Sequence, residues 1–231
     1  MIRSILFNIS FWTAFGLYIT IMYPFTLWFF SQKRTTIIVY RNIARLMLFC
    51  LKYISDIDCK ISNIDILKFQ LSKGPIIIGC NHQSVWETII FATLFDELAI
   101  IIKKELLSVP IAGLYFRKLG CIPIDRSSPI SSIKSIIKYG KIASEKGQSI
   151  LIFPNGTRST INENVEYKSG IFALYHSLKI PVIPAMVDSG QCWPKRSFRK
   201  NKGTIHLDFK EAIQPGLSKD EFMHIFENKM Q

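Results

Sequence analysis

Several patterns that would assign a chemistry directly are missing from this sequence of 231 residues. The five cysteines are odd in number and form no CxxC pair, which argues against a disulfide framework or a zinc ribbon and fits a reducing compartment. The four histidines show no HExxH or HxH spacing, so we expect no catalytic metal and no other cofactor. A GxSxG nucleophile elbow is also missing, so a serine hydrolase of that type is not expected.

Acidic residues are scarce, since lysine and arginine outnumber aspartate and glutamate 29 to 17. Such a surface should attract anions: phosphorylated small molecules, acidic proteins, anionic lipids or nucleic acid. No recognised nucleic-acid motif accompanies the charge, so nucleic acid is not an expected partner. The basic stretch WPKRSFRKNK at 193–202 could rest on anionic headgroups, receive an acidic carrier protein, or be a solvated loop.

The N-terminus has no charge between Ser4 and Gln32, and that is long enough to cross a bilayer. A signal peptide is disfavoured because the apolar part is too long and lacks a cleavage site. Pro24 should break or kink a helix, so two shorter helices that lie in the interface are the alternative to a span. Downstream, the spacing over 43–54 predicts an amphipathic helix on the membrane or against the domain, with an ordinary core-facing helix as the alternative. Cations follow at 33–52, which places the remainder of a spanning chain on the cytoplasmic side of the inner membrane. We therefore predict a membrane-associated helical segment over 1–58.

Beyond residue 74, short apolar runs alternate with helical patterns, which indicates an α/β domain over 59–231. The length suits a single core, and no repeat or low-complexity linker divides it. Pro129 and the apolar spacing after it predict a helix that ends by Gly147. The predicted strands are PIIIGC, ELAIIIK, GCIPID (an edge strand, because of Pro123), SILIFP, IPVIPAMV and TIHLDF.

The stretch NHQSVWE follows the first of these strands. Ser84 and Glu87 form an SxxE capping box, which predicts a helix that begins at Val85. His82 lies two residues before the cap, where its ring can meet the Glu87 carboxylate. That contact would fix the tautomer and leave the other ring nitrogen free to take a proton from a hydroxyl group. The alternative is a histidine with a purely structural role.

Two other strands end in an arginine beside hydroxyl or glycine residues, in IDRSS and FPNGTRS. Arg126 and Arg158 could bind phosphate in bidentate fashion, and the backbone N–H groups of Gly156 and Thr157 could add donors. The alternative is that NG makes a simple turn and that Arg126 pairs with its neighbour Asp125 or with solvent. Lys103, in KKEL, could likewise belong to a solvated charge cluster.

Cys80 lies two residues before His82, and residues at that spacing on a strand project to the same side. A Cys80/His82 nucleophilic pair would make the protein a thioesterase or transacylase with an acyl-enzyme intermediate. Free cysteines are more often small core residues, so packing is the alternative for this side chain.

Together, NHQSVWE, KKELLSVPIAGLYFRKLGCIPIDR, FPNGTRS and IPVIPA occur in the order and spacing of the four sequence blocks of the glycerolipid acyltransferases. They run from Asn81 to Ala185, and two are long enough to be specific. The chain therefore resembles this family, and within it the bacterial 1-acyl-glycerol-3-phosphate acyltransferases, which also have a hydrophobic N-terminus. The implied fold is a single mixed-sheet α/β domain flanked by helices.

The resemblance implies transfer of a fatty acyl group from a thioester, on acyl carrier protein or coenzyme A, to the sn-2 hydroxyl of lysophosphatidic acid. The product would be phosphatidic acid, for phospholipid synthesis, with membrane lipids as surroundings and without a metal. In the family a histidine is the general base and a carboxylate orients it, and these positions fall on His82 and Glu87. The family's positions that bear on the acceptor phosphate fall on Lys103, Arg126, Gly156, Thr157 and Arg158.

Two residues depart from the family pattern. Aspartate is usual where Glu87 stands, so the carboxylate here reaches one methylene further. Glutamate is most common where Asn155 stands. An amide keeps the capacity to hydrogen-bond acceptor hydroxyls but cannot balance nearby arginines, so another lyso-lipid or glycerol-3-phosphate is the alternative acceptor.

Overall fold

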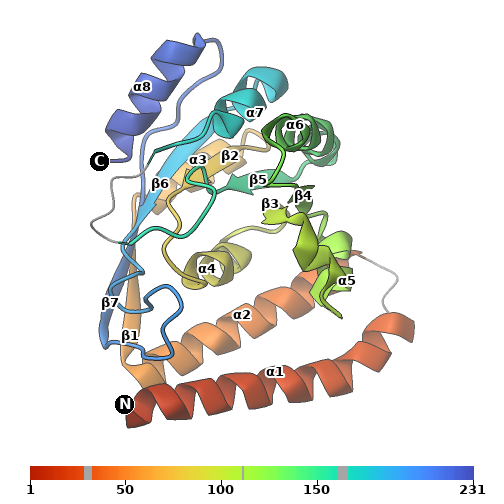
Figure 1. Ribbon diagram of the computed structural model, residues 1–231, viewed down its shortest axis with the longest axis vertical. Coiled ribbons are helices and arrows are strands. Elements are labelled where there is room, and N and C mark those ends of the chain that lie inside the picture. Colours follow the sequence, from red (N-terminus) through yellow and green to blue (C-terminus); the bar gives the residue numbers. More distant parts are fainter. Residues whose placement is uncertain (29–32, 111, 161–165) are drawn as a thin grey trace.

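The computed structural model describes residues 1–28, 33–110, 112–160 and 166–231, with only the backbone given for residues 14, 15 and 18–28. Within these residues, a seven-stranded mixed sheet forms the centre of the molecule and helices cover both of its faces (Figure 1). The predicted α/β fold with a mixed sheet is therefore confirmed.

The strands are β1 (Ile57–Ser62), β2 (Ile77–Cys80), β3 (Leu98–Lys103), β4 (Ile122–Ile124), β5 (Ser149–Ile152), β6 (Val182–Val187) and β7 (Gly203–Phe209), in the sheet order β1-β7-β6-β2-β5-β3-β4. The helices are α1 (Ile2–Trp28), α2 (Lys33–Ser55), α3 (Ile64–Leu71), α4 (Trp86–Leu94), the short 3₁₀ helix η1 (Lys104–Ser108), α5 (Ala112–Leu119), α6 (Pro129–Glu145), α7 (Gly170–Leu178) and α8 (Lys219–Lys229).

All six predicted strands are present, and β4 is an edge strand as Pro123 indicated. The helix predicted after Pro129 is α6. β1 was not predicted, because half of its residues are exposed and its sequence IDCKIS lacks an apolar run. It starts at Ile57, close to the boundary expected at residue 59, and pairs with β7. Strands β2 to β6 run parallel to one another, whereas β7 runs antiparallel to β6. The loops that follow β2 to β6 therefore meet at one edge of the sheet.

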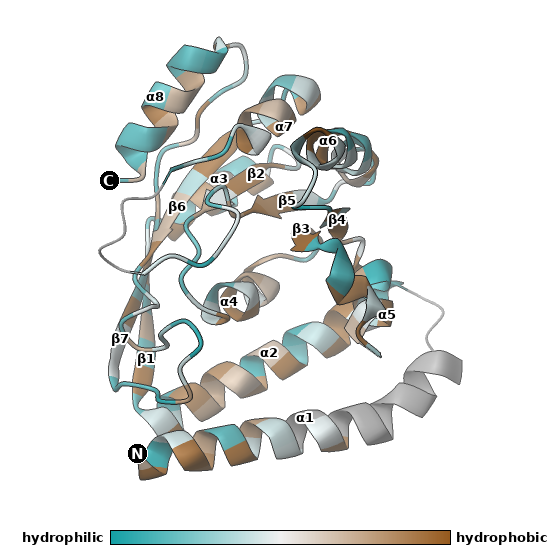
Figure 2. Ribbon diagram, in the orientation of Figure 1, coloured by the Kyte–Doolittle hydropathy of each residue, from teal (hydrophilic) through white to brown (hydrophobic). Residues whose placement is uncertain are grey.

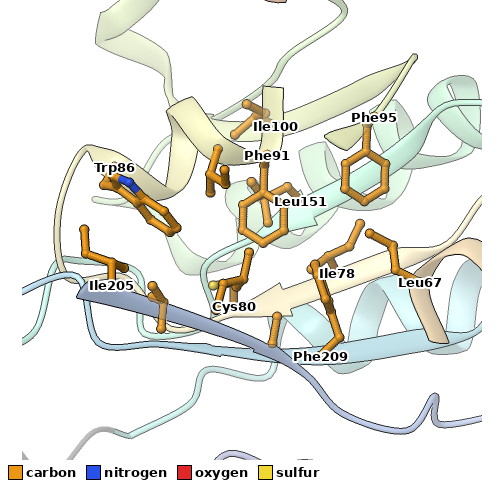
Figure 3. Packing of buried hydrophobic residues seen from close by; sticks show 14 of the residues in the cluster. Leu67, Ile78, Cys80, Trp86, Phe91, Phe95, Ile100, Leu151, Ile205 and Phe209 are labelled. Carbon is orange, nitrogen blue, oxygen red and sulfur yellow. The ribbon is translucent and has the colours of Figure 1, made fainter. Parts of the chain in front are cut away.

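The central strand β2 separates two apolar layers. Ile78 and Cys80 pack with α4 residues such as Phe91 on one face, as Figure 3 shows. Gly79 faces the other layer, where an added Cβ atom would lie 2.5 Å from the Cδ1 atom of Ile171 in α7. Only a residue without a side chain allows the helix to approach so closely. The sheet is therefore held firmly just before the chain leaves β2.

Helices α1 and α2 lie side by side, with α4 between α2 and the sheet (Figure 1). The amphipathic helix predicted over 43–54 lies within α2, which buries Ala44 and Leu51. Helix α1 includes Pro24, so the predicted break at that residue is absent.

The first turns of α1 are attached to the loop that follows β6. Ser4 Oγ accepts a hydrogen bond from the backbone N–H of Lys200 at 3.0 Å. The ring of Phe7 meets that of Trp193 edge to face, with 5.7 Å between the centroids. The side chain of Lys200 is buried beside both rings and donates to the carbonyl oxygen of Phe198. We call residues 188–200 the β6 loop.

Among the described residues, no helix is both long enough and apolar enough to cross a membrane. Several large apolar side chains of the N-terminal helices are nevertheless exposed, and Figure 2 shows apolar positions along both helices. They include Ile2, Leu6, Ile9 and Trp12 in α1 and Leu46, Phe49 and Tyr53 in α2.

Candidate active site

The loops after β2, β5 and β6 lie next to one another at the carboxyl edge of the sheet, because β2 pairs with both of the other strands. The loop after β2 carries His82 and Glu87, the loop after β5 carries the segment 153–158, and the β6 loop follows the third strand. Crevices at this edge are where open α/β sheets bind ligands. The order of the strands thus brings together segments that are far apart in the sequence.

His82 lies at the start of this edge with 13% of its side chain exposed. Its ring stacks on the ring of Phe153 at a centroid distance of 4.1 Å, and its carbonyl oxygen accepts a hydrogen bond from the N–H of Ser159 at 2.8 Å. The Nδ1 atom lies 3.6 Å from Glu87 Oε2 and has no hydrogen-bond partner among the described residues. That distance exceeds a hydrogen bond, but catalytic contacts often tighten only when substrate binds.

The Glu87 carboxylate is completely buried. Its Oε1 atom accepts hydrogen bonds from the N–H of Gln83 at 2.9 Å, the N–H of Ser84 at 3.0 Å and the hydroxyl of Ser189 at 2.6 Å. Its Oε2 atom accepts a further contact from the N–H of Ser84 at 3.1 Å and faces His82. Hydrogen bonds of this kind to a charged acceptor compensate for burial. The structure therefore brings the predicted pair together.

The capping box is confirmed in one half and wrong in the other. Glu87 accepts the N–H of Ser84 as predicted. The helix starts at Trp86 instead of Val85, and the Ser84 hydroxyl accepts the N–H of Trp86 at 2.9 Å. Val85 itself occupies the cap position, so the Ser84 hydroxyl binds an N–H only two residues ahead and not the one three residues ahead.

Side chains that were not predicted attach this segment to the β6 loop. The amide of Asn81 donates to the carbonyl oxygen of Val187 at 2.8 Å and accepts its N–H at 2.7 Å. Gln83 Oε1 accepts the N–H of Gly190 at 3.0 Å. The signal in the sequence was a polar DSG directly after the apolar run IPVIPAMV, which resembles the other polar strand ends.

Cys80 is not placed for nucleophilic catalysis. It is fully buried in the core beside Ile78 and Phe209 (Figure 3), and its thiol points to the carbonyl oxygen of Asn81 at 3.1 Å. Burial, together with the charge of Glu87, raises the pKa of the Cys80 thiol well above its ordinary value. A thiol that stays protonated is a poor nucleophile, so the packing interpretation fits better.

The predicted cations differ in their partners. Asp125 binds Lys104 and the hydroxyl of Ser127, so the alternative in which Arg126 pairs with this carboxylate does not hold. Among the described residues, the side chains of Arg126 and Arg158 have no hydrogen-bond or ion-pair partner. Lys103 pairs with exposed Glu105 at 3.2 Å. The two arginines therefore remain available for an anion.

An apolar cavity of about 560 Å³ lies between β5, α6 and α7. Such a volume suits a ligand of substrate size. Phe153, which stacks on His82, is also part of its wall. The other lining residues include Ile101, Ile124, Ile133, Ile136, Ile152, Gly170 and Met223, with Arg126, Gly156, Glu166 and Lys168 as polar members.

The predicted phosphate residues thus fall into two groups. Arg126 and Gly156 share the cavity. Arg158 and Thr157 lie on the turn that leads to Ser159, which contacts the carbonyl of His82. The turn conformation depends on Gly156, whose φ of 72° is in the left-handed region.

Asn155 is buried between these groups. Its Nδ2 atom donates to the Ser159 hydroxyl at 3.4 Å, whereas its Oδ1 atom has no hydrogen-bond partner among the described residues. A buried acceptor without a partner is costly. A ligand hydroxyl at this position would satisfy it.

The fold and the site are those of an α/β enzyme in which a histidine faces a buried carboxylate beside an apolar cavity that has an arginine in its lining. The sequence profile of the family described as Acyltransferase matches residues 60–188, so the chain belongs to this acyltransferase family.

Relatives with known names support this assignment. The 1-acyl-sn-glycerol-3-phosphate acyltransferase of Pseudomonas aeruginosa is 30% identical over 218 residues, which cover 92% of this chain and 80% of that protein. The protein of the same name from Cocos nucifera is 28% identical over 63% of this chain and 48% of its own. In structure, the chain resembles the crystal structure of the 1-acyl-sn-glycerophosphate (LPA) acyltransferase PlsC from Thermotoga maritima, with a TM-score of 0.78, 19% identity, and coverage of 98% and 94% of the two chains.

Proposed function

We propose that this protein transfers a fatty acyl group from an acyl thioester to the sn-2 hydroxyl of 1-acyl-glycerol-3-phosphate and so makes phosphatidic acid for phospholipid synthesis. The activity named for the Pseudomonas relative, which is matched over most of both chains, supports this substrate. The observation that carries the proposal is the buried Glu87 carboxylate 3.6 Å from the unpartnered Nδ1 atom of His82.

In the proposed reaction, His82 is neutral and its Nδ1–H is directed at Glu87. Its Nε2 atom removes the proton of the acceptor hydroxyl as that oxygen attacks the thioester carbonyl carbon. The carbon–sulfur bond then breaks, and the leaving thiolate takes the proton back from Nε2. Glu87 orients the ring and stabilises the imidazolium that forms between these steps. The thiol belongs to acyl carrier protein or to coenzyme A, and no acyl-enzyme is formed.

The arginines would hold the phosphate of the acceptor. The side chains of Arg126 and Arg158 have no hydrogen-bond or ion-pair partner among the described residues. The backbone N–H of Thr157 would add a donor, whereas that of Gly156 already donates to the carbonyl oxygen of Phe153 at 2.9 Å. Lys103 would exchange Glu105 for the same phosphate. The apolar cavity beside Arg126 would receive a fatty chain. A fixed phosphate places the hydroxyl next to His82, and positioning contributes much of the rate.

The exposed apolar side chains of α1 and α2 would lie in the interface of the inner membrane, with the sheet domain on its cytoplasmic side. Amphipathic helices bind membranes in this way. Basic residues of the β6 loop would approach the anionic headgroups. A substrate that carries a fatty chain stays in the bilayer, so this attachment would deliver it to His82.

The test is an acyl-transfer assay with purified protein, both thioester donors and a panel of lyso-acceptors. His82→Ala should lower kcat about a hundredfold or more, with little change in the KM of lysophosphatidic acid. His224→Ala, on the exposed face of α8, is the matched control and should keep full activity. Unchanged turnover in His82→Ala would remove this histidine as the base.

A different acceptor is the second candidate, because the unpartnered Oδ1 atom of Asn155 stands where the family most often has a carboxylate. Glycerol-3-phosphate or another lyso-lipid would present hydroxyls to it. If Asn155→Glu changes which acceptor of the panel is acylated fastest, the Asn155 amide determines the choice of acceptor.

A Cys80 thioesterase is the weakest candidate. Radioactive acyl donor should leave no label on the protein, and Cys80→Ala should keep its activity. Labelling that disappears in this variant would instead establish a covalent route.

A further inference from the structure

Ser189, in the β6 loop, makes a contact that the proposed reaction does not yet use. Its side chain is completely buried, and its hydroxyl donates to Glu87 Oε1 at 2.6 Å. The other donors to this carboxylate among the described residues are backbone N–H groups of Gln83 and Ser84. Ser189 is therefore the one side chain, within the described part of the protein, that donates a hydrogen bond to Glu87.

The three residues that donate to Glu87 come from different parts of the chain, so they restrain the carboxylate differently. Gln83 and Ser84 belong to the same short segment as Glu87, so they move together with it. Ser189 follows β6 and is 102 residues away from Glu87 along the chain. Its hydrogen bond therefore ties the carboxylate to the sheet and limits its rotation. Without it, Oε1 would keep only donors from the carboxylate's own turn.

The β6 loop is itself held in place. The Asn81 side chain forms hydrogen bonds with both the carbonyl oxygen and the N–H of Val187, two residues before Ser189. The Gln83 side chain accepts the N–H of Gly190. A donor that is fixed in this way can set the direction of its acceptor. With Oε1 occupied by three donors, the Oε2 atom is the one presented to His82 Nδ1, at 3.6 Å.

We infer that Ser189 is a positioning residue of this enzyme: its hydroxyl fixes Glu87 so that the carboxylate can orient His82. The inference rests on the proposed function, because it assumes that His82 is the base. It assigns to a residue outside the four family blocks a role in the reaction itself, beyond the packing of the β6 loop.

The test compares Ser189→Ala with wild type, Glu87→Gln and His82→Ala in steady-state assays. Ser189→Ala should lower kcat about tenfold and leave both KM values unchanged. Glu87→Gln should lower kcat further, because it removes the charge that the Ser189 hydroxyl only positions.

Two further variants separate positioning from stability. Ser189→Thr keeps the hydroxyl and should restore kcat. Ser149→Ala removes a buried serine hydroxyl that accepts the N–H of Ile76 at the opposite end of β5, and should lower the melting temperature without changing kcat.

An unchanged kcat in folded Ser189→Ala, or a fall in kcat that Ser189→Thr does not reverse, would overturn the inference. Full activity in His82→Ala would instead overturn the proposed function. If Ser189→Ala does not fold, Ser189→Cys replaces it: a weaker donor should give an intermediate kcat, and wild-type kcat in this variant would overturn the inference.

Discussion

The carboxylate beside His82 and the arginines near the cavity are bonded in opposite ways. Glu87 is buried, and its two oxygens accept hydrogen bonds from Gln83, Ser84 and Ser189. Arg126 and Arg158 have neither hydrogen bonds nor ion pairs through their side chains among the described residues. Asp125, which could have neutralised Arg126, instead binds Lys104 and Ser127.

This contrast separates two tasks. A group that orients a base must be held by the protein before substrate arrives, because its direction determines the rate. A group that binds a phosphate does so most readily without a protein partner, because a competing carboxylate, such as Glu105 beside Lys103, has to be displaced first. Under the proposed function, saturated bonding thus marks the carboxylate that orients the base, and unpaired charge marks the two arginines that bind the acceptor.

The largest expected effect comes from removal of the Glu87 charge. Glu87→Gln should lower kcat about a hundredfold, with smaller changes in KM, since the amide cannot stabilise an imidazolium. Glu145→Gln, at the exposed end of α6, is the control and should behave as wild type. Thermal melts should accompany the assay, because the new amide places a donor opposite backbone N–H groups. A kcat near that of wild type would show that Glu87 serves only the fold.

Arg126→Ala should act on binding instead of on the chemical step. We expect the KM of the phosphorylated acceptor to rise about tenfold, which corresponds to ~1.4 kcal/mol, with the KM of the thioester unchanged. Arg158→Ala should behave in the same way, whereas exposed Arg117→Ala in α5 should not. Equal increases in both KM values would contradict the assignment to phosphate.

A smaller effect should follow from a side chain added inside the cavity. A Cβ atom at Gly170 would lie 3.4 Å from Ile136 Cδ1 and 3.9 Å from Ile152 Cδ1, both in the cavity wall. Gly170→Val should therefore shift kcat/KM toward shorter acyl chains, by about fivefold between long and short substrates. Ala173→Val, on the same helix but outside the lining, is the control. An unaltered chain-length profile would exclude the cavity as an acyl site.

The smallest effect concerns Asp125, which pairs with Lys104 and so leaves Arg126 unpaired. Lys104 and Ser127 lower the pKa of Asp125 to about 2. The pKa of Asp125 in the folded protein is below the ordinary value of about 3.9. The ionised carboxylate therefore stabilises the fold above about pH 3.9, and this stabilisation is lost as the pH falls toward about 2. Asp125→Asn should lower the melting temperature slightly at neutral pH, and the difference should narrow from about pH 4 to about pH 2.5. A constant difference would mean that the charge is not responsible.

Local patterns in the sequence were sufficient for much of this structure. The six predicted strands are apolar runs or, in TIHLDF, an apolar alternation, and His82 meets Glu87 because five residues and one helical turn are enough to bring them together. β1 was missed because three consecutive residues of this edge strand are exposed, so no apolar run marks it.

Contacts between distant strands were not predictable in this way. The bond from Ser189 to Glu87 depends on β6 lying next to β2, and the meeting of Arg126 with Gly156 depends on the order β5-β3-β4. A single sequence gives the strands but not their order. The same limit explains why the sequence offered only the neighbour Arg126 as a partner for Asp125: Lys104 directly follows β3, which lies beside β4 in the sheet.

The attachment of α1 to the β6 loop has a practical consequence for anyone who purifies this enzyme. Deletion of residues 1–58 would be the usual route to a better-behaved catalytic fragment. It would also remove Ser4 and Phe7, and with them the cover over Trp193 and Lys200 in the loop that carries Ser189. In the fragment the β6 loop would be held less firmly, and with it the Ser189 hydroxyl that donates to Glu87. The intact chain in detergent is therefore the better choice for kinetic work.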